Sequence, residues 1–196
     1  MSRSASVERT TKETSIKVRV DLDGTGRTSI ATGVGFFDHM LDQLGKHSGF
    51  DLEVDASGDL QVDSHHTVED TGIALGQAIS EALAGREGVR RYGDALVPME
   101  EALAQVALDL SGRPLLEFDV EIPAEQIGNY DPDLTQEFFN ALTRSAGITL
   151  HARLLAGRNS HHIVEAVFKG VARALAEAVT VDPRRGGDIP STKGRL

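Results

Sequence analysis

The chain has 196 residues, of which 40% are hydrophobic and 26% charged, and its formal net charge is −10. These values are typical of a folded protein, and the acidic balance argues against a broad nucleic-acid-binding surface, because phosphates are held mainly by Lys and Arg. The sequence has no Cys, which excludes disulfides, Cys-type zinc sites and thiol nucleophiles. No segment has the apolar run of a secretory signal or the ~18 apolar residues of a membrane helix. We therefore expect a soluble, cytoplasmic protein.

The first half of the chain alternates strand and helix patterns. Residues 15–24 (SIKVRVDLDG) alternate apolar and polar side chains and predict a strand. From Phe36 to Leu44 the apolar residues recur at helical spacing. A short strand pattern follows at 51–56 (DLEVDA), and a second helix is predicted over 68–85 (VEDTGIALGQAISEALAG).

The second half repeats this order. A strand is predicted at 115–122 (LLEFDVEI), a helix at 136–147, a strand at 148–155 (ITLHARLL) and a long helix at 163–179. Residues 85–101 (GREGVRRYGDALVPMEE) are interpreted as a bridge between the halves.

Capping residues and the polar tail complete this outline. Ser64 and Ser160 stand where N-caps of the two long helices are expected, and Gly85 and Gly147 where helices end. Residues 181–196 (VDPRRGGDIPSTKGRL) lack a core-forming pattern, so we expect them to be mobile unless a partner or ligand fixes them.

The repeated landmarks indicate an internal duplication. DLDG, FFDHMLDQL and DSHHTVED in the first half recur in the same order as DLSG, QEFFNALTRSAG and NSHHIVEA. We predict an α+β fold of two halves, each a small, mostly antiparallel sheet packed on two helices. The expected divisions are a first repeat at 1–92, a second repeat at 93–182, and a C-terminal tail at 183–196 that contributes to the active site.

The doubled motif Ser-His-His-x-Val-Glu is a candidate site for two metal ions. On a helix, the Glu shares a face with one His of its pair, whereas neighbouring histidines point ~100° apart and do not reach one ion. Imidazole and carboxylate ligands suit Mn, Fe, Co or Zn. Two further candidates, His39 and Glu137, occupy nearly the same place in their own helices. We group the ligands into two sets that both draw on both repeats: His39, His66, Glu69 and His161 for one ion, and Glu137, His65, His162 and Glu165 for the other.

Several long motifs together resemble the imidazoleglycerol-phosphate dehydratase family of histidine biosynthesis, in its monofunctional form. They are GVGFFDHMLDQLGKHSGFDL, GDLQVDSHHTVEDTGIALG, DLSGRP, RNSHHIVEAVFK and DPRRGGDIPSTKG. The resemblance implies two Mn(II) ions per active site and halves similar to domain 2 of ribosomal protein S5. It also implies a hollow homo-oligomer of 24 subunits with active sites between subunits, and no nucleic-acid or membrane partner. The implied reaction is the dehydration of D-erythro-imidazole-glycerol phosphate, a small phosphorylated imidazole, to imidazole-acetol phosphate.

The resemblance also implies roles for single residues. Its metal-ligand positions fall on His39, His65, His66, Glu69, His161, His162 and Glu165. Glu137 stands where many relatives have His, and a carboxylate remains a competent Mn(II) ligand. The implied catalytic carboxylates are Glu13, which shuttles a proton, with Glu69 and Glu165. The implied substrate contacts are Glu13, Gln43, His47, Arg91, Arg113, Lys169, Ser191 and Lys193. Apart from the resemblance, these last residues are ordinary polar surface positions.

Two other functions fit the same motifs. A dinuclear metal hydrolase acting on a small phosphorylated or amide substrate releases phosphate or an acid without loss of water. A non-catalytic metal-binding shell uses the motifs only to join subunits. In that shell, replacing Glu13 changes nothing, whereas replacing His66 disperses the particle.

Overall fold

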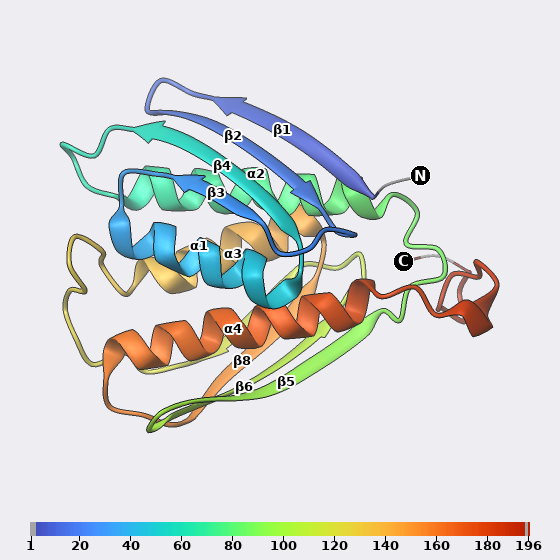
Figure 1. Cartoon of the computed structure of the whole chain (residues 1–196). Coiled ribbons are helices and arrows are strands. Elements are labelled where there is room, and N and C mark those ends of the chain that lie inside the picture. Colours follow the sequence, from blue (N-terminus) through green and yellow to red (C-terminus); the bar gives the residue numbers. More distant parts are fainter. Residues whose placement is uncertain (1–2, 195) are drawn as a thin grey trace.

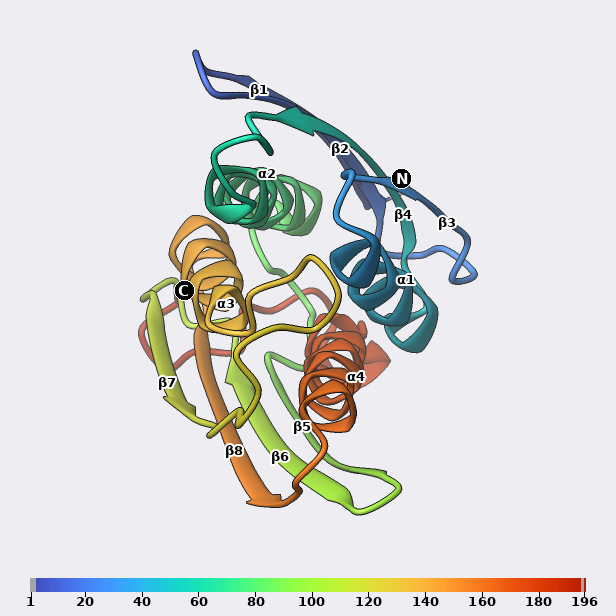
Figure 2. The ribbon, with the colours of Figure 1, turned by 90° about the vertical axis from the view of Figure 1, so that its left-hand side faces the viewer.

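The computed structural model describes residues 3–194 and 196, and in these residues two four-stranded sheets enclose a layer of four helices (Figures 1 and 2). The first sheet has the order β1-β2-β4-β3. Its strands are β1 (Ser4–Thr10), β2 (Thr14–Asp21), β3 (Thr28–Ala31) and β4 (Asp51–Gly58). The second sheet has the order β5-β6-β8-β7. Its strands are β5 (Tyr92–Met99), β6 (Ala102–Asp109), β7 (Leu115–Asp119) and β8 (Thr149–Ala156).

The helices lie between the sheets, with α1 packed on α4 and α2 on α3. They are α1 (Gly35–Ser48), α2 (His65–Leu83), α3 (Leu134–Ala146) and α4 (Ser160–Val179). At Gly76 an added Cβ would lie 2.6 Å from the carbonyl oxygen of Leu142, so a residue without a side chain lets α2 approach the backbone of α3. A short 3₁₀ helix (Pro183–Arg185) follows α4.

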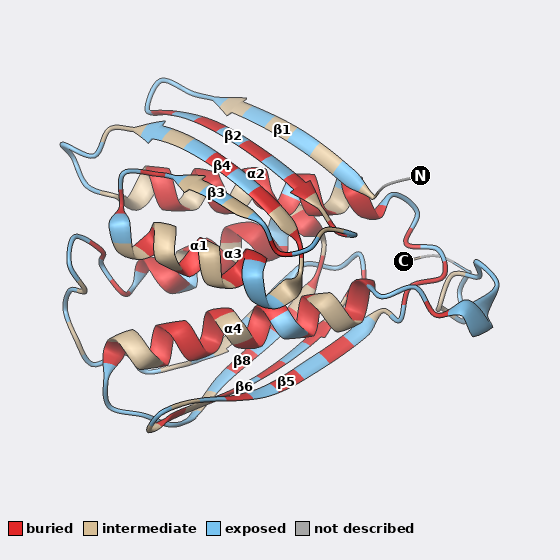
Figure 3. Cartoon of the chain, in the orientation of Figure 1, coloured by how far each residue is buried: buried red, intermediate tan, exposed pale blue. Residues whose placement is uncertain are grey.

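Both sheets have the same topology, which confirms the predicted duplicated α+β fold. In each sheet two strand pairs are antiparallel, while β3 with β4 and β7 with β8 are parallel. Along β2 the buried and exposed residues alternate strictly, with Ile16, Val18 and Val20 facing the helices. The buried residues therefore concentrate between the sheets and the helices (Figure 3). This burial of apolar surface is the main force that holds the layers together.

All of the helices α1 to α4 begin at the same end of the molecule (Figure 1). This follows from the topology, because each helix comes after a strand of a parallel pair, namely β3, β4, β7 or β8. The hairpin turns between β1 and β2 and between β5 and β6 lie at that end as well. The fold thus gathers helix N-termini and two turns where the His-His motifs occur.

Several local expectations were wrong. The segment 85–101 contains strand β5 and is not merely a bridge. The N-cap of α4 is Asn159, whose side chain accepts from the backbone of His161 and His162, while the Ser160 hydroxyl instead accepts from Ala124 N. Ser64 does occupy the N-cap position of α2, but without a side-chain cap.

The ends of the helices and the tail also correct the sequence-based picture. Helix α2 ends at a C-cap on Ala84 rather than at Gly85, whereas Gly147 is the C-cap of α3 as expected. Part of the tail lies against its own chain, since Asp188 O accepts a hydrogen bond from Gly88 N at 3.0 Å, and the expected mobility of the tail stays a prediction. Residues 1–2 and 195, which belong to the expected first repeat and tail, lie outside the described residues. Among the described helices none is long and apolar enough to cross a membrane.

Candidate active site

Three of the expected metal ligands meet where α1 packs on α4. His39 projects from the second turn of α1, and His161 and Glu165 lie one turn apart on α4. The Nε2 atoms of His161 and His39 lie 3.1 and 3.6 Å from Glu165 Oε2. One ligand atom from each residue lies within 4.8 Å of the others, which is compatible with one ion. Two imidazoles and a carboxylate form a donor set that fits Mn(II) as well as Zn or Fe.

Glu165 is the most enclosed member of this cluster. Its side chain is 7% exposed, and its Oε1 accepts a hydrogen bond from Lys169 Nζ at 2.6 Å. Burial alone would raise the pKa of Glu165, but the hydrogen bond and charge of Lys169 outweigh burial and hold the pKa below its usual value. Glu165 is therefore an anion at neutral pH, as a metal ligand must be.

The first His-His pair begins α2 and lies beside Glu13. His65 Nε2 is 3.8 Å from Glu69 Oε2, one helical turn along. His66 has two carboxylate neighbours, because its Nδ1 is 3.1 Å from Asp59 Oδ2 and its Nε2 is 3.9 Å from Glu13 Oε2. The hydrogen bond with Asp59 is the main cause that raises the pKa of His66.

The second His-His pair has a matching carboxylate contact at its second histidine. His162 Nδ1 is 2.7 Å from Glu101 Oε2, in the turn between β5 and β6. This hydrogen bond raises the pKa of His162 and, with backbone donors from Asn159 and Arg158, lowers the pKa of Glu101 to about 2. Sequence reasoning missed both Asp59 and Glu101.

Within one chain the structure brings together part of the predicted grouping, and the full grouping, which allowed for ligands from neighbouring subunits, stays a prediction. His39 and His161 come together as expected, but the carboxylate beside them is Glu165 rather than Glu69. The reason is the helix pairing, since Glu69 lies on α2, which packs on α3. Glu137 is half-buried in the first turn of α3, and no three-ligand group among the described residues includes it.

Four of the expected substrate-binding residues line one pocket at the opposite end of α4. The pocket includes Arg91, Arg113, Ser191 and Lys193. Arg91 is fixed there by Asp109, which accepts from Nε at 2.7 Å, and by the carbonyl oxygen of Pro190, which accepts from Nη1 at 2.8 Å. Converging Arg and Lys side chains provide the geometry that holds a phosphate.

Three of the other four expected substrate contacts, Gln43, His47 and Lys169, lie along the seam between α1 and α4, whereas Glu13 lies in the turn between β1 and β2. Gln43 Oε1 and His47 Nε2 are 3.1 Å apart on α1, one turn from each other. Burial and the nearby positive charges of Lys169 and Arg173 lower the pKa of His47. Lys169 does not line the Arg91 pocket, because it lies on α4 one turn beyond Glu165.

The metal-type cluster and the cationic pocket are far apart within one chain. His161 lies in the first turn of α4, whereas the backbone N–H of Arg91 donates a hydrogen bond to the carbonyl oxygen of Ala178, near the last turn of that helix. A helix of 20 residues, the length of α4, spans roughly 30 Å. A small phosphorylated molecule cannot touch both regions of the same chain.

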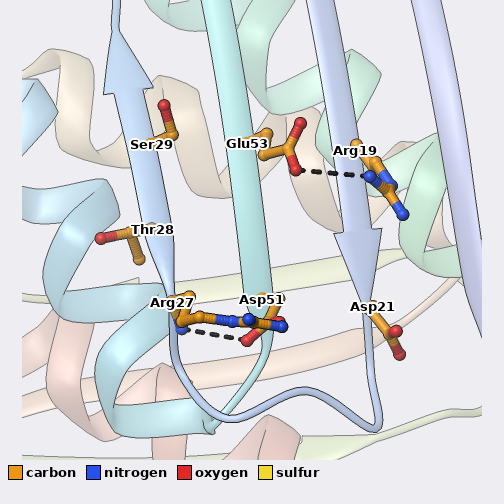
Figure 4. Close-up of a pocket in the computed structure, with 7 residues that line it drawn as sticks. All are labelled: Arg19, Asp21, Arg27, Thr28, Ser29, Asp51 and Glu53. Atoms are coloured by element: carbon orange, nitrogen blue, oxygen red, sulfur yellow. Dashed lines mark hydrogen bonds and ion pairs between the residues drawn. The ribbon is translucent and has the colours of Figure 1, made fainter.

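A further pocket lies on the outer face of the first sheet (Figure 4). Its charged side chains pair with one another, since Arg27 Nη2 is 2.7 Å from Asp51 Oδ2 and Arg19 Nη1 is 3.4 Å from Glu53 Oε1. The sheet separates this pocket from the helices and from the His-His motifs. We therefore assign it no part in the candidate site.

Comparisons with known proteins identify the family of the chain. The family profile described as imidazoleglycerol-phosphate dehydratase matches residues 32–175. A relative with that name from Roseobacter denitrificans is 61% identical over 99% of this chain and 100% of its own. Another from Nitrobacter hamburgensis is 57% identical over 99% of this chain and 98% of its own.

Solved structures extend the likeness to three dimensions. The imidazoleglycerol-phosphate dehydratase of Staphylococcus aureus superposes with a TM-score of 0.83 at 38% identity, covering 91% of this chain and 99% of that one. The enzyme from Pyrococcus furiosus, in complex with (S)-C348, gives 0.84 at 38% identity, covering 97% and 100%. The chain therefore belongs to the imidazoleglycerol-phosphate dehydratase family and is an enzyme of the hydro-lyase class.

Proposed function

We propose that this enzyme dehydrates imidazole glycerol phosphate to imidazole-acetol phosphate in the histidine-biosynthesis pathway of the cytoplasm. Full-length similarity to proteins named for this substrate supports the proposal. The observation that carries it is the cluster of His39, His161 and Glu165 inside the region that the family profile matches. The dehydration must remove a carbon-bound proton that no neighbouring carbonyl group acidifies. This cluster provides ligands for a metal ion that would stabilise the resulting negative charge.

The proposed cofactor is a pair of Mn(II) ions in each active site. His39, His161 and Glu165 supply ligands for one ion, and the His-His pairs at α2 and α4 supply further imidazoles. Bound Mn(II) would stabilise the negative charge that develops on the substrate's imidazole ring as the carbon-bound proton leaves. The chain itself holds the ligands in place through the packing of α1 on α4 and of α2 on α3.

Glu13 is the residue that we assign to proton transfer. Its side chain is 55% exposed in the turn between β1 and β2, and its nearest described charged partner is His66, at 3.9 Å. The backbone around it is ordered, because the Thr11 hydroxyl accepts from Glu13 N and Thr14 N. A half-exposed carboxylate at the edge of the site, whose contact with His66 is as long as 3.9 Å, can take up and return a proton.

The substrate phosphate is assigned to the pocket of Arg91, Arg113, Ser191 and Lys193. Because this pocket lies roughly a full length of α4 away from the metal-type cluster of the same chain, the complete site needs a second subunit. This separation supports a homo-oligomer with active sites between subunits, for which the family resemblance suggests 24 subunits.

The test is an assay of purified, Mn(II)-loaded protein with imidazole glycerol phosphate, in which ketone and free phosphate are both measured. We expect metal-dependent ketone formation, loss of activity on chelation, and at least a ~100-fold lower kcat for Glu13→Gln with Mn(II) content unchanged. Glu53→Gln, on the outer sheet face, serves as the charge-matched control. Release of phosphate without ketone would favour the hydrolase, and an active Glu13→Gln variant would refute the role of Glu13.

A further inference from the structure

Two carboxylates outside the expected ligand set each contact one histidine of a His-His pair. Asp59 Oδ2 is 3.1 Å from Nδ1 of His66, and Glu101 Oε2 is 2.7 Å from Nδ1 of His162. In both cases the histidine is the second of its pair. In both cases the contact involves Nδ1, which leaves the Nε2 atom of the histidine free to bind a metal ion.

Glu101 occupies the same place in the second repeat as Glu13 does in the first. Glu13 immediately precedes β2, and Glu101 immediately precedes β6. The two strands have the same length, end at Asp21 and Asp109, and hold the same position in their sheets. The two residues therefore stand at equivalent turns of the two repeats. Each turn lies beside the His-His pair of its own repeat, on α2 for Glu13 and on α4 for Glu101.

The two equivalent carboxylates have different surroundings. Glu13 is 55% exposed and lies 3.9 Å from Nε2 of its histidine. Glu101 is 22% exposed, contacts Nδ1 of His162, and also accepts from the backbone N of Asn159 at 2.8 Å. Glu101 thus contacts both the imidazole of His162 and the N-cap residue Asn159 of α4, the helix that carries His162.

The difference between the repeats is explained by the loop before each long helix. In the first repeat this loop contains Asp59, which contacts His66 Nδ1 and leaves Glu13 without that task. In the second repeat the corresponding loop reads Gly-Arg-Asn-Ser (residues 157–160) and has no acidic residue. Glu101 supplies the missing carboxylate from the neighbouring turn.

We propose that Asp59 and Glu101 are positioning residues, which accept a hydrogen bond from Nδ1–H and so present Nε2 of His66 and His162 to the metal ions. Glu101 thereby performs in one repeat a task different from that of its counterpart Glu13. A carboxylate behind a ligating imidazole fixes the tautomer and ring orientation and raises the basicity of the ligand. This inference rests on the proposed two-metal function.

Equilibrium dialysis of the full-length protein with Mn(II) tests the inference without any assay of activity. Wild-type protein is expected to bind two Mn(II) ions per active site. Asp59→Ala and Glu101→Ala are each expected to weaken Mn(II) binding by about 10–100-fold. Glu101→Gln keeps an oxygen that can accept a hydrogen bond from Nδ1–H, so its Mn(II) affinity is expected to lie between those of Glu101→Ala and wild type. If only the negative charge of Glu101 mattered, Glu101→Gln would bind Mn(II) as weakly as Glu101→Ala.

Glu100→Ala is the discriminating variant. Glu100 lies in the same turn, with a carboxylate oxygen within 4.8 Å of Glu101 and His162, but it does not supply the 2.7 Å contact to Nδ1. Near-wild-type binding by Glu100→Ala supports positioning by Glu101 alone. Equal losses in Glu100→Ala and Glu101→Ala would instead mean that the three residues bind an ion directly, which overturns the proposal.

The failure of each idea is distinguishable. Wild-type protein that binds no Mn(II) would refute the metal-dependent function on which the inference rests. Two bound ions in wild type, with unchanged affinity in both Asp59→Ala and Glu101→Ala, would overturn only the positioning role. Because Glu101 also anchors the backbone of Asn159, thermal melting of each variant is measured alongside. The Asp59 variant provides the independent result if Glu101→Ala does not fold.

Discussion

Subunits with complementary defects are expected to restore activity to one another. His161→Ala removes a metal-type ligand at the start of α4, and Arg91→Ala removes a guanidinium from the cationic pocket near its end. Each variant alone is expected to be inactive. The two regions are separated by roughly 30 Å, the length of the 20-residue α4, and the proposed site therefore takes its metal end and its cationic pocket from different chains.

The size of the recovery follows from this arrangement. In a randomly mixed assembly with equal amounts of both variants, about half of the metal ends and about half of the cationic pockets are intact. When they combine independently, about one quarter of the sites contain both intact parts. Co-expression of the two variants with different affinity tags, followed by tandem purification and the ketone assay, measures this fraction.

A second pair provides the matched control. His39→Ala and His161→Ala damage the same cluster, whose members lie within one chain. Mixed assemblies of these two variants are expected to stay inactive, because every cluster carries one of the two defects. Activity below a few per cent of wild type in the His161→Ala and Arg91→Ala mixture, with both tags present in one particle, would refute a site shared between subunits.

Three further outcomes are expected. Arg86→Ala should lower the free energy of unfolding in urea by about 3 kcal/mol, because the buried guanidinium donates hydrogen bonds to three backbone carbonyl oxygens, two of them at the end of α3. Asp70→Asn should lower kcat by about 10–100-fold at unchanged Mn(II) content, since Asp70 accepts from Thr14 and so fixes the turn that holds Glu13. In metal-free protein the pKa values of His66 and His162 are raised by folding, so their protonated forms stabilise the folded state. This contribution is complete below the unfolded pKa of about 6.5 and is lost as the pH rises through the higher pKa values of the folded state. The melting temperature with a chelator should therefore fall as the pH rises above neutral, whereas Mn(II) affinity should increase because binding requires the loss of those protons.

The sequence was sufficient for the duplication and for most elements of the fold. The helical periods of α1 and α3 and the alternation of β2 are strong because these elements bury large apolar side chains mainly on one face. Strands β1, β3, β5 and β6 were not predicted, and for β5 the reason is that two of its helix-facing residues, Gly93 and Ala95, are small. Gly93 faces α4 so closely that an added Cβ would meet the Ala174 carbonyl oxygen, and small residues carry little periodic signal.

The pairing of ligands was not predictable from the motif alone. Both repeats carry the same His-His-x-x-Glu spacing, so the sequence does not say whether His39 meets Glu69 or Glu165. That choice depends on which helices pack, and α1 packs on α4. The contacts of Asp59 and Glu101 were missed for a related reason. Each residue lies in a loop, so no helical spacing along the sequence links it to the histidine that it contacts. Aligning the two strands β2 and β6 would have placed Glu101 opposite Glu13 and given the signal.

The position of the His-His pairs at helix N-termini explains why acidic residues must surround them. The N-terminus of a helix carries a partial positive charge, which disfavours a protonated imidazole or a metal cation and favours an anion. His65, His66, His161 and His162 all lie in the first turns of α2 and α4, at the end where α1 and α3 also begin. A cation bound there needs negative charge to offset these dipoles. Glu69 and Glu165 supply it one turn farther along, and Asp59 and Glu101 supply it from the loops. Removing either loop carboxylate should therefore weaken the cation site electrostatically as well as through the orientation of the imidazole.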